Sequence, residues 1–202
     1  MLERMRTWLP ASEPSSDIRA RDAVLGAALI LFSHFGYDQV TVEKVAREAG
    51  LAESFVWDLF GTKEELFAVV VKAALADTIG TGDDIETLGR RVVDAVLPGR
   101  PTREAGNPAI LILRGAGNAL AAPILRRCIE RHFEELMAIA PKGADDSQRA
   151  ALLFAVLFGF QVAWKVMGDD MLSTADPAIL QRHLVLLLQT LIDPLETDEA
   201  RP

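Results

Sequence analysis

The chain has 202 residues, of which 50% are hydrophobic and 25% are charged, so it can bury a sizeable core and wholesale disorder is excluded. Its 21 Lys and Arg residues against 29 Asp and Glu residues give a formal net charge of -8, so any binding to nucleic acid must be local. The one cysteine, Cys128, cannot form an internal disulfide, which favours a reducing, cytoplasmic location.

No targeting or membrane segment is predicted. The start of the chain lacks the apolar core of a signal peptide. The longest apolar stretch, 150–164, is too short for a membrane span and lies between Arg149 and Lys165. We therefore expect no membrane among the partners of the chain.

The N-terminal region divides into an arm and a helix. Prolines and serines without apolar periodicity predict a loose arm over 1–18. From Arg19, apolar residues recur at helical spacing and predict a first helix, with Asp17 as its N-cap and Gly36 as its stop.

Two short helices are predicted next. Thr41 is expected to cap a helix over 42–49, which Gly50 ends in a left-handed turn. The segment 53–60 predicts a third helix that stops at Gly61. Two short helices joined by a turn that contains glycine form a helix-turn-helix.

The rest of the chain is also expected to be helical, because no alternating strand pattern is present. The predicted helices cover 63–77, 84–97, 107–120, 123–139, 147–167 and 177–192. A mobile loop is expected over 97–106 and a frayed tail after Pro194. The fold class predicted is all-α.

Several short motifs stand in register over 19–72. They are a first helix ending in FGY, a Thr-capped helix ending in AG, the aromatic residue Trp57 late in the next helix, and a Phe-x-x-Lys-x-x-Leu step from Phe60. In these motifs the segment resembles the N-terminal DNA-binding region of the tetracycline-repressor (TetR) family of bacterial transcription regulators. The C-terminal half, with ADP before the last helix and FGFQVAWKVMG in the helix before it, resembles the regulatory domain of actinobacterial-type members.

The resemblance implies a domain organisation and a function. It implies a helix-turn-helix DNA-binding domain over 19–66 and a helical effector-binding and dimerisation domain over 67–194, with a tail over 195–202. It also implies a homodimer that binds a palindromic operator in double-stranded DNA, as a repressor that an unknown small molecule releases. A ligand that prefers one dimer conformation would move the helix over 63–77 and change the spacing of the recognition helices.

Three residues are candidates for contacts to the DNA backbone. The hydroxyl of Thr41 lies at a helix N-terminus, where it can act as a cap alone or as a cap that also holds a phosphate. The indole of Trp57 is expected to contact the backbone, and the alternative is a packed core aromatic. Lys63 starts a helix, where a cation is unfavourable, so a phosphate partner would explain it, and the alternative is a solvated lysine.

Base reading is expected from the start of the third helix. Ser54 can exchange hydrogen bonds with base edges, and the ring of Phe55 can meet a thymine methyl, although Phe55 fits a core position equally well. Further cations are candidates either for phosphate neutralisation or for ordinary surface charge: Arg19, Arg21, Lys44 and Arg47.

The predicted DNA-binding region departs from the family pattern in charge. Ala52 stands where a capping Ser or Thr is usual, and Glu53 and Asp58 stand where basic or small residues are usual. Over 1–67, seven Lys and Arg against eleven Asp and Glu leave a net charge of -4. We therefore expect weak non-specific DNA binding with a small dependence on salt.

The last two helices are candidates for a dimer interface. The segment 150–166 is apolar almost all the way round, which exceeds what one small core needs, although an ordinary monomer core is the alternative. A two-fold dimer would place two recognition helices about 34 Å apart, one DNA turn. The interface candidates are Leu152, Val156, Phe158, Gly159, Val162, Leu184, Leu187, Leu188 and Leu191.

The middle helices are candidates for an effector pocket. Arg114 stands among apolar neighbours and could orient an anionic or polar ligand; the alternative is an arginine that reaches solvent or pairs with Glu130 or Glu134. The lining candidates are Val71, Leu111, Arg114, Ile124 and Cys128, of which Cys128 also fits a small core position.

Two other classes of function stay open. One is a dimeric ligand- or protein-binding module of the same fold that has lost DNA binding, which the acidic N-terminal region favours. The other is an all-helical enzyme, against which stands the lack of a nucleophile with a base, of paired carboxylates and of a glycine-rich phosphate loop. His34, His132 and His183 are scattered without ligand spacing, so we expect neither a metal nor another cofactor.

Overall fold

The computed structural model describes residues 16–76, 90, 93, 108–139, 142–167 and 174–193. All regular elements within these ranges are helices, so the predicted all-α class is confirmed. The helices are α1 (Ser16–Phe35), α2 (Val42–Ala49), α3 (Glu53–Phe60), α4 (Lys63–Ala76), α6 (Pro108–Ala116), α7 (Ala121–Ile139), α8 (Asp146–Gln161), the π-helix η1 (Val162–Met167) and α10 (Pro177–Ile192).

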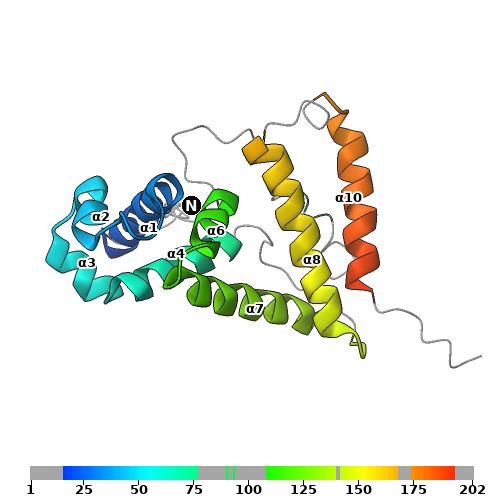
Figure 1. Ribbon diagram of the computed structural model, residues 1–202, viewed down its shortest axis with the longest axis horizontal. Coiled ribbons are helices and arrows are strands. Elements are labelled where there is room, and N and C mark those ends of the chain that lie inside the picture. The colour runs from blue at the N-terminus through cyan, green and yellow to red at the C-terminus, as the bar shows by residue number, and fades with distance from the viewer. Residues whose placement is uncertain are drawn as a thin grey trace, which may run out of the picture.

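The helices form two groups that α4 and α7 join. The three N-terminal helices gather at one end of the molecule, and α8 and α10 lie side by side at the other (Figure 1). Helix α4 packs against α1 and α3 on one side and against α7 on the other, and α6 packs against α1. Helices α4 and α7 therefore connect the two groups.

An aromatic cluster holds the N-terminal group together. Phe32 lies at its centre, with its ring stacked on Tyr37 at 6.0 Å and edge-on to Phe67 at 4.9 Å. Such aromatic pairs add about 0.5–1.5 kcal/mol each beyond the burial of their area. Phe67 belongs to α4, so the first half of α4 is part of the same core.

The local signals for helix ends were mostly correct. Gly36 and Gly50 have positive φ angles of 75° and 70°, as a left-handed helix stop requires. The N-cap predicted at Asp17 is wrong, because α1 begins at Ser16. Asp17 lies instead in the first helical turn, where its negative charge interacts favourably with the helix dipole.

The connection between α6 and α7 differs from the prediction. Helix α6 ends at Ala116 rather than at residue 120. The side-chain Oδ1 of Asn118 accepts hydrogen bonds at 3.0 Å from the backbone N–H groups of Leu120 and Ala121, so a new helix begins before Pro123. Of the arm predicted over 1–18, residues 16–18 belong to α1, so this part of the prediction is wrong. Residues 1–15, the predicted helix over 84–97 apart from residues 90 and 93, the loop over 97–106 and the tail lie outside the described residues.

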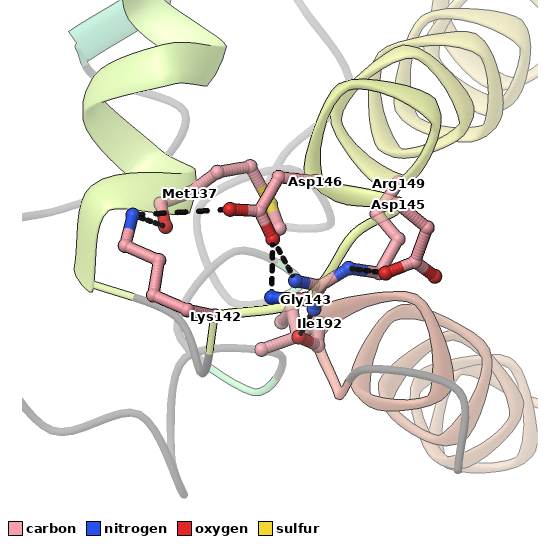
Figure 2. A network of polar contacts seen from close by, with 7 residues as sticks. All are labelled: Met137, Lys142, Gly143, Asp145, Asp146, Arg149 and Ile192. Atoms are coloured by element: carbon pink, nitrogen blue, oxygen red, sulfur yellow. Dashed lines mark hydrogen bonds and ion pairs between the residues drawn. The ribbon is translucent and has the colours of Figure 1, made fainter. Parts of the chain in front are cut away.

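A buried arginine fixes α8 to α10. Arg149 is only 4% exposed, and its Nε lies 3.2 Å from Asp145 Oδ1. Its guanidinium also donates to Asp146 and to the backbone carbonyl of Ile192 at the end of α10 (Figure 2). The hydrogen bond from the backbone N–H of Gly143 is the main cause that lowers the pKa of Asp146, and the guanidinium of Arg149 lowers it further. The network closes the second core, which contains Phe133, Leu136, Met137, Leu153, Leu157, Leu188 and Ile192.

The helical segment Asp146–Trp164 is longer than the apolar stretch seen in the sequence. Its 19 residues meet the length and hydropathy of a membrane span, a test that core helices of soluble proteins also pass. The segment packs against α7 and α10, and Leu153 and Leu157 are buried in these contacts. Part of its apolar surface is therefore buried in the core.

Candidate DNA interface and effector pockets

Helices α2 and α3 form the predicted helix-turn-helix. Thr41 Oγ1 accepts a hydrogen bond at 3.2 Å from the backbone N–H of Lys44, which confirms Thr41 as the N-cap of α2. Ala52 precedes α3 without a side-chain cap bond. Thr41 is also exposed, so a phosphate contact in addition to the cap stays a prediction.

The outer face of α3 carries the predicted reading residues. Ser54 and Trp57 are exposed, and Phe55 is half-buried. The indole Nε1–H of Trp57 donates to Glu53 Oε1 at 3.1 Å, one helical turn earlier. A phosphate that binds this N–H must therefore replace the Glu53 carboxylate.

Lys63 has a role at the start of α4 that the sequence did not reveal. It is half-buried, and its Nζ lies 4.3 Å from the centroid of the Tyr37 ring, a cation–π geometry. The hydroxyl of Tyr37 donates to Glu64 Oε1 at 2.9 Å, and burial, with help from Glu64, raises the pKa of Tyr37. Burial also lowers the pKa of Lys63. Lys63 therefore fixes α4 to the loop after α1, and it is not a simply solvated lysine.

The other candidate phosphate-binding cations are exposed, but they already have partners within the chain. Three such contacts are Arg21 over the Phe60 ring at 4.9 Å, Lys44 Nζ to the Gln39 carbonyl at 2.7 Å, and Arg47 to Glu43 at 3.8 Å. Arg19 is exposed as well. Contacts to DNA would have to compete with these interactions, which are individually weak at exposed sites.

One contact between the N-terminal group and the turn before α7 was not predicted from the sequence. Asn118 Nδ2 donates to Asp38 Oδ2 at 2.7 Å, so the turn before α7 is bonded to the loop between α1 and α2. The two residues are 80 positions apart, and no local pattern indicates that they meet. Asn118 thus caps α7 with one side-chain atom and holds the helix-turn-helix with the other.

A pocket of about 520 Å³ lies between α4 and α7, and we call it the α4–α7 pocket. Of the predicted lining residues it contains Ile124 and Cys128. Burial raises the pKa of the Cys128 thiol, although the charge of nearby Arg127, Arg131 and Lys72 opposes the rise. The thiol is therefore neutral at pH 7 and resembles a small apolar residue.

His132 also lines the α4–α7 pocket. Its Nε2 is buried without a hydrogen-bond partner among the described residues. Burial lowers the pKa of His132; the nearby charge of Glu135 opposes this shift, and that of Lys72 adds to it. The imidazole is therefore neutral at pH 7.

A second pocket, of about 650 Å³, lies between α6, α7 and α8, and we call it the α6–α8 pocket. Its walls are mostly apolar, with polar groups at a few positions, as is typical of small-molecule sites. It is lined by Ile112, Leu113, Ala116, Ala122, Leu125, Arg126, Ile129, Glu130, Phe133, Glu134, Ser147, Ala150, Ala151, Phe154 and Phe158.

The structure places the other predicted pocket residues elsewhere. Val71 and Leu111 are buried in the first core cluster. Arg114 is exposed on α6 and lines neither pocket, which contradicts its role in a pocket and agrees with the alternative of an arginine that reaches solvent. The apolar sequence around Arg114 misled because one face of α6 is buried while Arg114 is on the exposed face. Within the described ranges, no group of three or more His, Cys, Asp or Glu side chains is arranged to hold a metal ion.

Comparison with known proteins identifies the family. A model described as "Tetracyclin repressor-like, C-terminal domain" matches residues 86–192, more than half of the chain, and one described as "Bacterial regulatory proteins, tetR family" matches residues 24–70. The chain belongs to the TetR family of bacterial transcriptional regulators. No curated protein matches it.

Solved structures of several regulators share the fold. One, from Streptomyces coelicolor A3, has 23% identity and a TM-score of 0.54, covering 91% of this chain and 99% of that one. A putative TetR-family regulator from Rhodococcus sp. has 15% identity and a TM-score of 0.65, covering 87% and 100%. A fatty acid degradation regulator from Bacillus halodurans has 19% identity and a TM-score of 0.62, covering 84% and 97%.

Membership of the TetR family gives the general activity. TetR regulators bind DNA, typically act as dimers with small-molecule effectors, and are generally not enzymes. The capped α2, the short α3 and the aromatic cluster at the start of α4 are how this chain builds the DNA-binding end of the family fold.

The dimer candidates of the TetR regulator fall into three sets by exposure. Leu188 is 0% exposed and belongs to the second core, so it cannot contact a partner, and its place in the interface prediction is wrong. Leu152 and Leu187 are 52% and 46% exposed, and Gly159 is exposed too. Val156, Phe158, Val162, Leu184 and Leu191 are half-buried. The sequence reading missed the exposed apolar residues Ile179 and Leu186 on α10, because apolar periodicity alone does not show which stripe faces the core.

Proposed function

We propose that the chain is a cytoplasmic repressor that reads a palindromic operator as a homodimer and leaves it when a small molecule binds. In this proposal 19–66 is the DNA-binding domain, and 67–194 is the effector and dimer domain. Ser54 and Phe55 read bases, while Thr41, Trp57 and Lys63 lie against the DNA backbone.

One observation carries the proposal. Helix α4 belongs to the core of the helix-turn-helix through Phe67 and also forms a wall of the α4–α7 pocket through Ala68, Val69 and Lys72. A ligand that separates α4 from α7, or that shifts α7 from the α6–α8 pocket, therefore acts on the element that positions α3. Such coupling needs a ligand with different affinity for the two arrangements.

The dimer is supported by the apolar surface that α8 and α10 leave exposed. Leu152 and Gly159 on α8 and Ile179, Leu186 and Leu187 on α10 are exposed. Exposed apolar residues on two neighbouring helices are typical of interaction sites in soluble proteins. A two-fold axis beside these helices would place the second copy of α3 at the other half-site of the operator.

The test is selection of binding sites from a random double-stranded DNA library by the full-length protein at low salt. We expect an enriched palindrome, and we expect Ser54→Ala and Phe55→Ala to change the preferred bases while the protein stays folded. The selected operator then serves to screen compounds for release. A bound compound that leaves operator affinity unchanged would contradict the effector mechanism.

A second candidate function has its own observation. Glu53 and Asp58 are exposed on α3, and Ala52 gives α3 no side-chain cap. These features favour a dimeric ligand- or protein-binding module that has lost DNA binding. Folded, dimeric protein that enriches no DNA sequence would support this function over the first.

A further inference from the structure

The α6–α8 pocket has an aromatic wall. Phe133 and Phe154 meet edge to face at 5.6 Å between ring centroids, and Phe154 and Phe158 are stacked at 5.4 Å. All three rings line the pocket. The faces of such rings carry partial negative charge and attract cations as well as apolar groups.

The charged side chains of the pocket lie in one row on α7. Arg126, Glu130 and Glu134 line the pocket at successive helical turns, and all three are exposed. Among the described residues, neither Glu130 nor Glu134 has an ion-pair or hydrogen-bond partner. The row has a net negative charge, so an anion at Arg126 would also meet two carboxylates, whereas a cation near Glu130 and Glu134 would gain from both.

We propose that the α6–α8 pocket binds an amphipathic organic cation. Phe133, Phe154 and Phe158 hold its apolar body, and Glu130 and Glu134 hold its charge. This inference deepens the proposed function and rests on it, because it names the chemical class of the effector. It also reverses the charge of the ligand that Arg114 suggested from the sequence.

The direct test uses two ions of the same shape and opposite charge, tetraphenylphosphonium and tetraphenylborate. Their binding to the full-length protein is measured by isothermal titration calorimetry in the same buffer. We expect the phosphonium to bind about tenfold more tightly than the borate, because the rings and the two carboxylates favour positive charge. Equal binding of the two ions, or tighter binding of the borate, would overturn the proposal.

Variants test the two carboxylates, which line both pockets, with a matched control on the same helix. Glu134→Gln should weaken phosphonium binding about two- to fivefold, and together with Glu130→Gln about tenfold. Glu135→Gln makes the same change in charge at an exposed position that lines only the α4–α7 pocket, and it should leave binding within about twofold. A loss for Glu135→Gln as large as that for Glu134→Gln would contradict the assignment.

Two further readouts complete the test. Phe154→Leu keeps an apolar wall but removes a ring, so it should weaken phosphonium binding about threefold and leave the borate unchanged. The single cysteine, Cys128, lines the α4–α7 pocket, so phosphonium in the α6–α8 pocket should leave its alkylation rate unchanged. Protection of Cys128 by the phosphonium would place the cation in the other pocket and overturn the proposal.

The two proposals fail separately. Phosphonium binding that depends on Glu134 but never changes operator affinity would support the cation site and contradict the effector mechanism. Release of the operator only by anionic or neutral compounds would support the effector mechanism and overturn the cation site.

Discussion

The bond between Asn118 and Asp38 offers a sharp test of how the turn before α7 is joined to the N-terminal group of helices. Asn118→Asp keeps an oxygen to cap α7 but replaces the donor with a carboxylate that faces Asp38 Oδ2, 2.7 Å from the original amide. The lost hydrogen bond contributes about 1 kcal/mol, and repulsion between two exposed charges at this separation adds about 1 kcal/mol. The new charge at the helix N-terminus offsets about 0.5 kcal/mol.

We therefore expect Asn118→Asp to lower the free energy of unfolding by about 1.5 kcal/mol in urea denaturation at pH 7. Combining it with Asp38→Asn restores a donor opposite the carboxylate, with the cap intact, and should recover about 1 kcal/mol. Hydrogen exchange of the backbone amides of α2 and α3 in the double variant also measures how strongly the turn before α7 is coupled to the helix-turn-helix. If the change in the free energy of unfolding of the double variant equals the sum of the changes in the two single variants, the bond does not form in solution and the reasoning is refuted.

Four further changes have defined outcomes. Gly115→Ala places a methyl group 2.6 Å from a leucine side chain of α7 and should lower stability by about 1–3 kcal/mol, whereas Gly117→Ala has open space and should be neutral; thermal unfolding of both variants checks this. Arg149→Met should lower the free energy of unfolding by about 3 kcal/mol in urea, because it leaves a buried carbonyl and two carboxylates without their donor; a change under about 1 kcal/mol would show that the network is not formed. Because burial lowers the pKa of His132, its contribution to stability is present above its ordinary value of 6.5 and is lost as the pH falls toward the folded value. The His132→Leu variant should accordingly lose less stability than the unmodified protein between about pH 7 and 5. Melting temperatures that fall equally with pH in the two proteins would contradict this. Glu53→Gln removes one negative charge beside the indole of Trp57 and should tighten non-specific DNA binding about two- to fivefold at low salt, as measured by fluorescence anisotropy; an unchanged affinity would place α3 away from the DNA.

Much of the N-terminal group could be predicted because its signals are local. Thr41 and Gly50 end a short helix by interactions that lie within the helix and its caps. The Thr62–Glu65 pair at the start of α4, which the sequence analysis did not use, makes the two reciprocal bonds of a capping box, at 3.2 and 2.7 Å. Such motifs have the same geometry wherever they occur, so residue type and spacing suffice to find them.

The C-terminal half was harder because its features depend on contacts between distant residues. Arg149 marked only the edge of an apolar stretch in the sequence, and the structure buries it against the end of α10. Leu187 and Leu188 are the same residue type at neighbouring positions, yet the first is exposed and the second is fully buried. Which side of an apolar helix faces the core depends on the neighbouring helices, and this information is not in the local pattern.

The candidate sites show the same division. The exposed positions on α2 and α3 followed from the helix-turn-helix pattern, whereas the partners of Trp57 and Lys63 did not. The indole N–H of Trp57 is bonded to Glu53, and the ammonium of Lys63 lies over the Tyr37 ring. DNA would have to compete with both contacts. The pockets needed the packing of α4, α6, α7 and α8, and only Ile124 and Cys128 among the predicted lining residues lie in one.

The most direct test of the central claim is a hydroxyl-radical footprint of the full-length protein on the DNA that it selects. The account predicts two protected half-sites related by a two-fold axis, with centres about 34 Å apart, and loss of both when Ser54→Ala or Phe55→Ala is used. Protection of a single half-site, or a uniform pattern without protected positions, would contradict a dimeric reader of DNA built on α3.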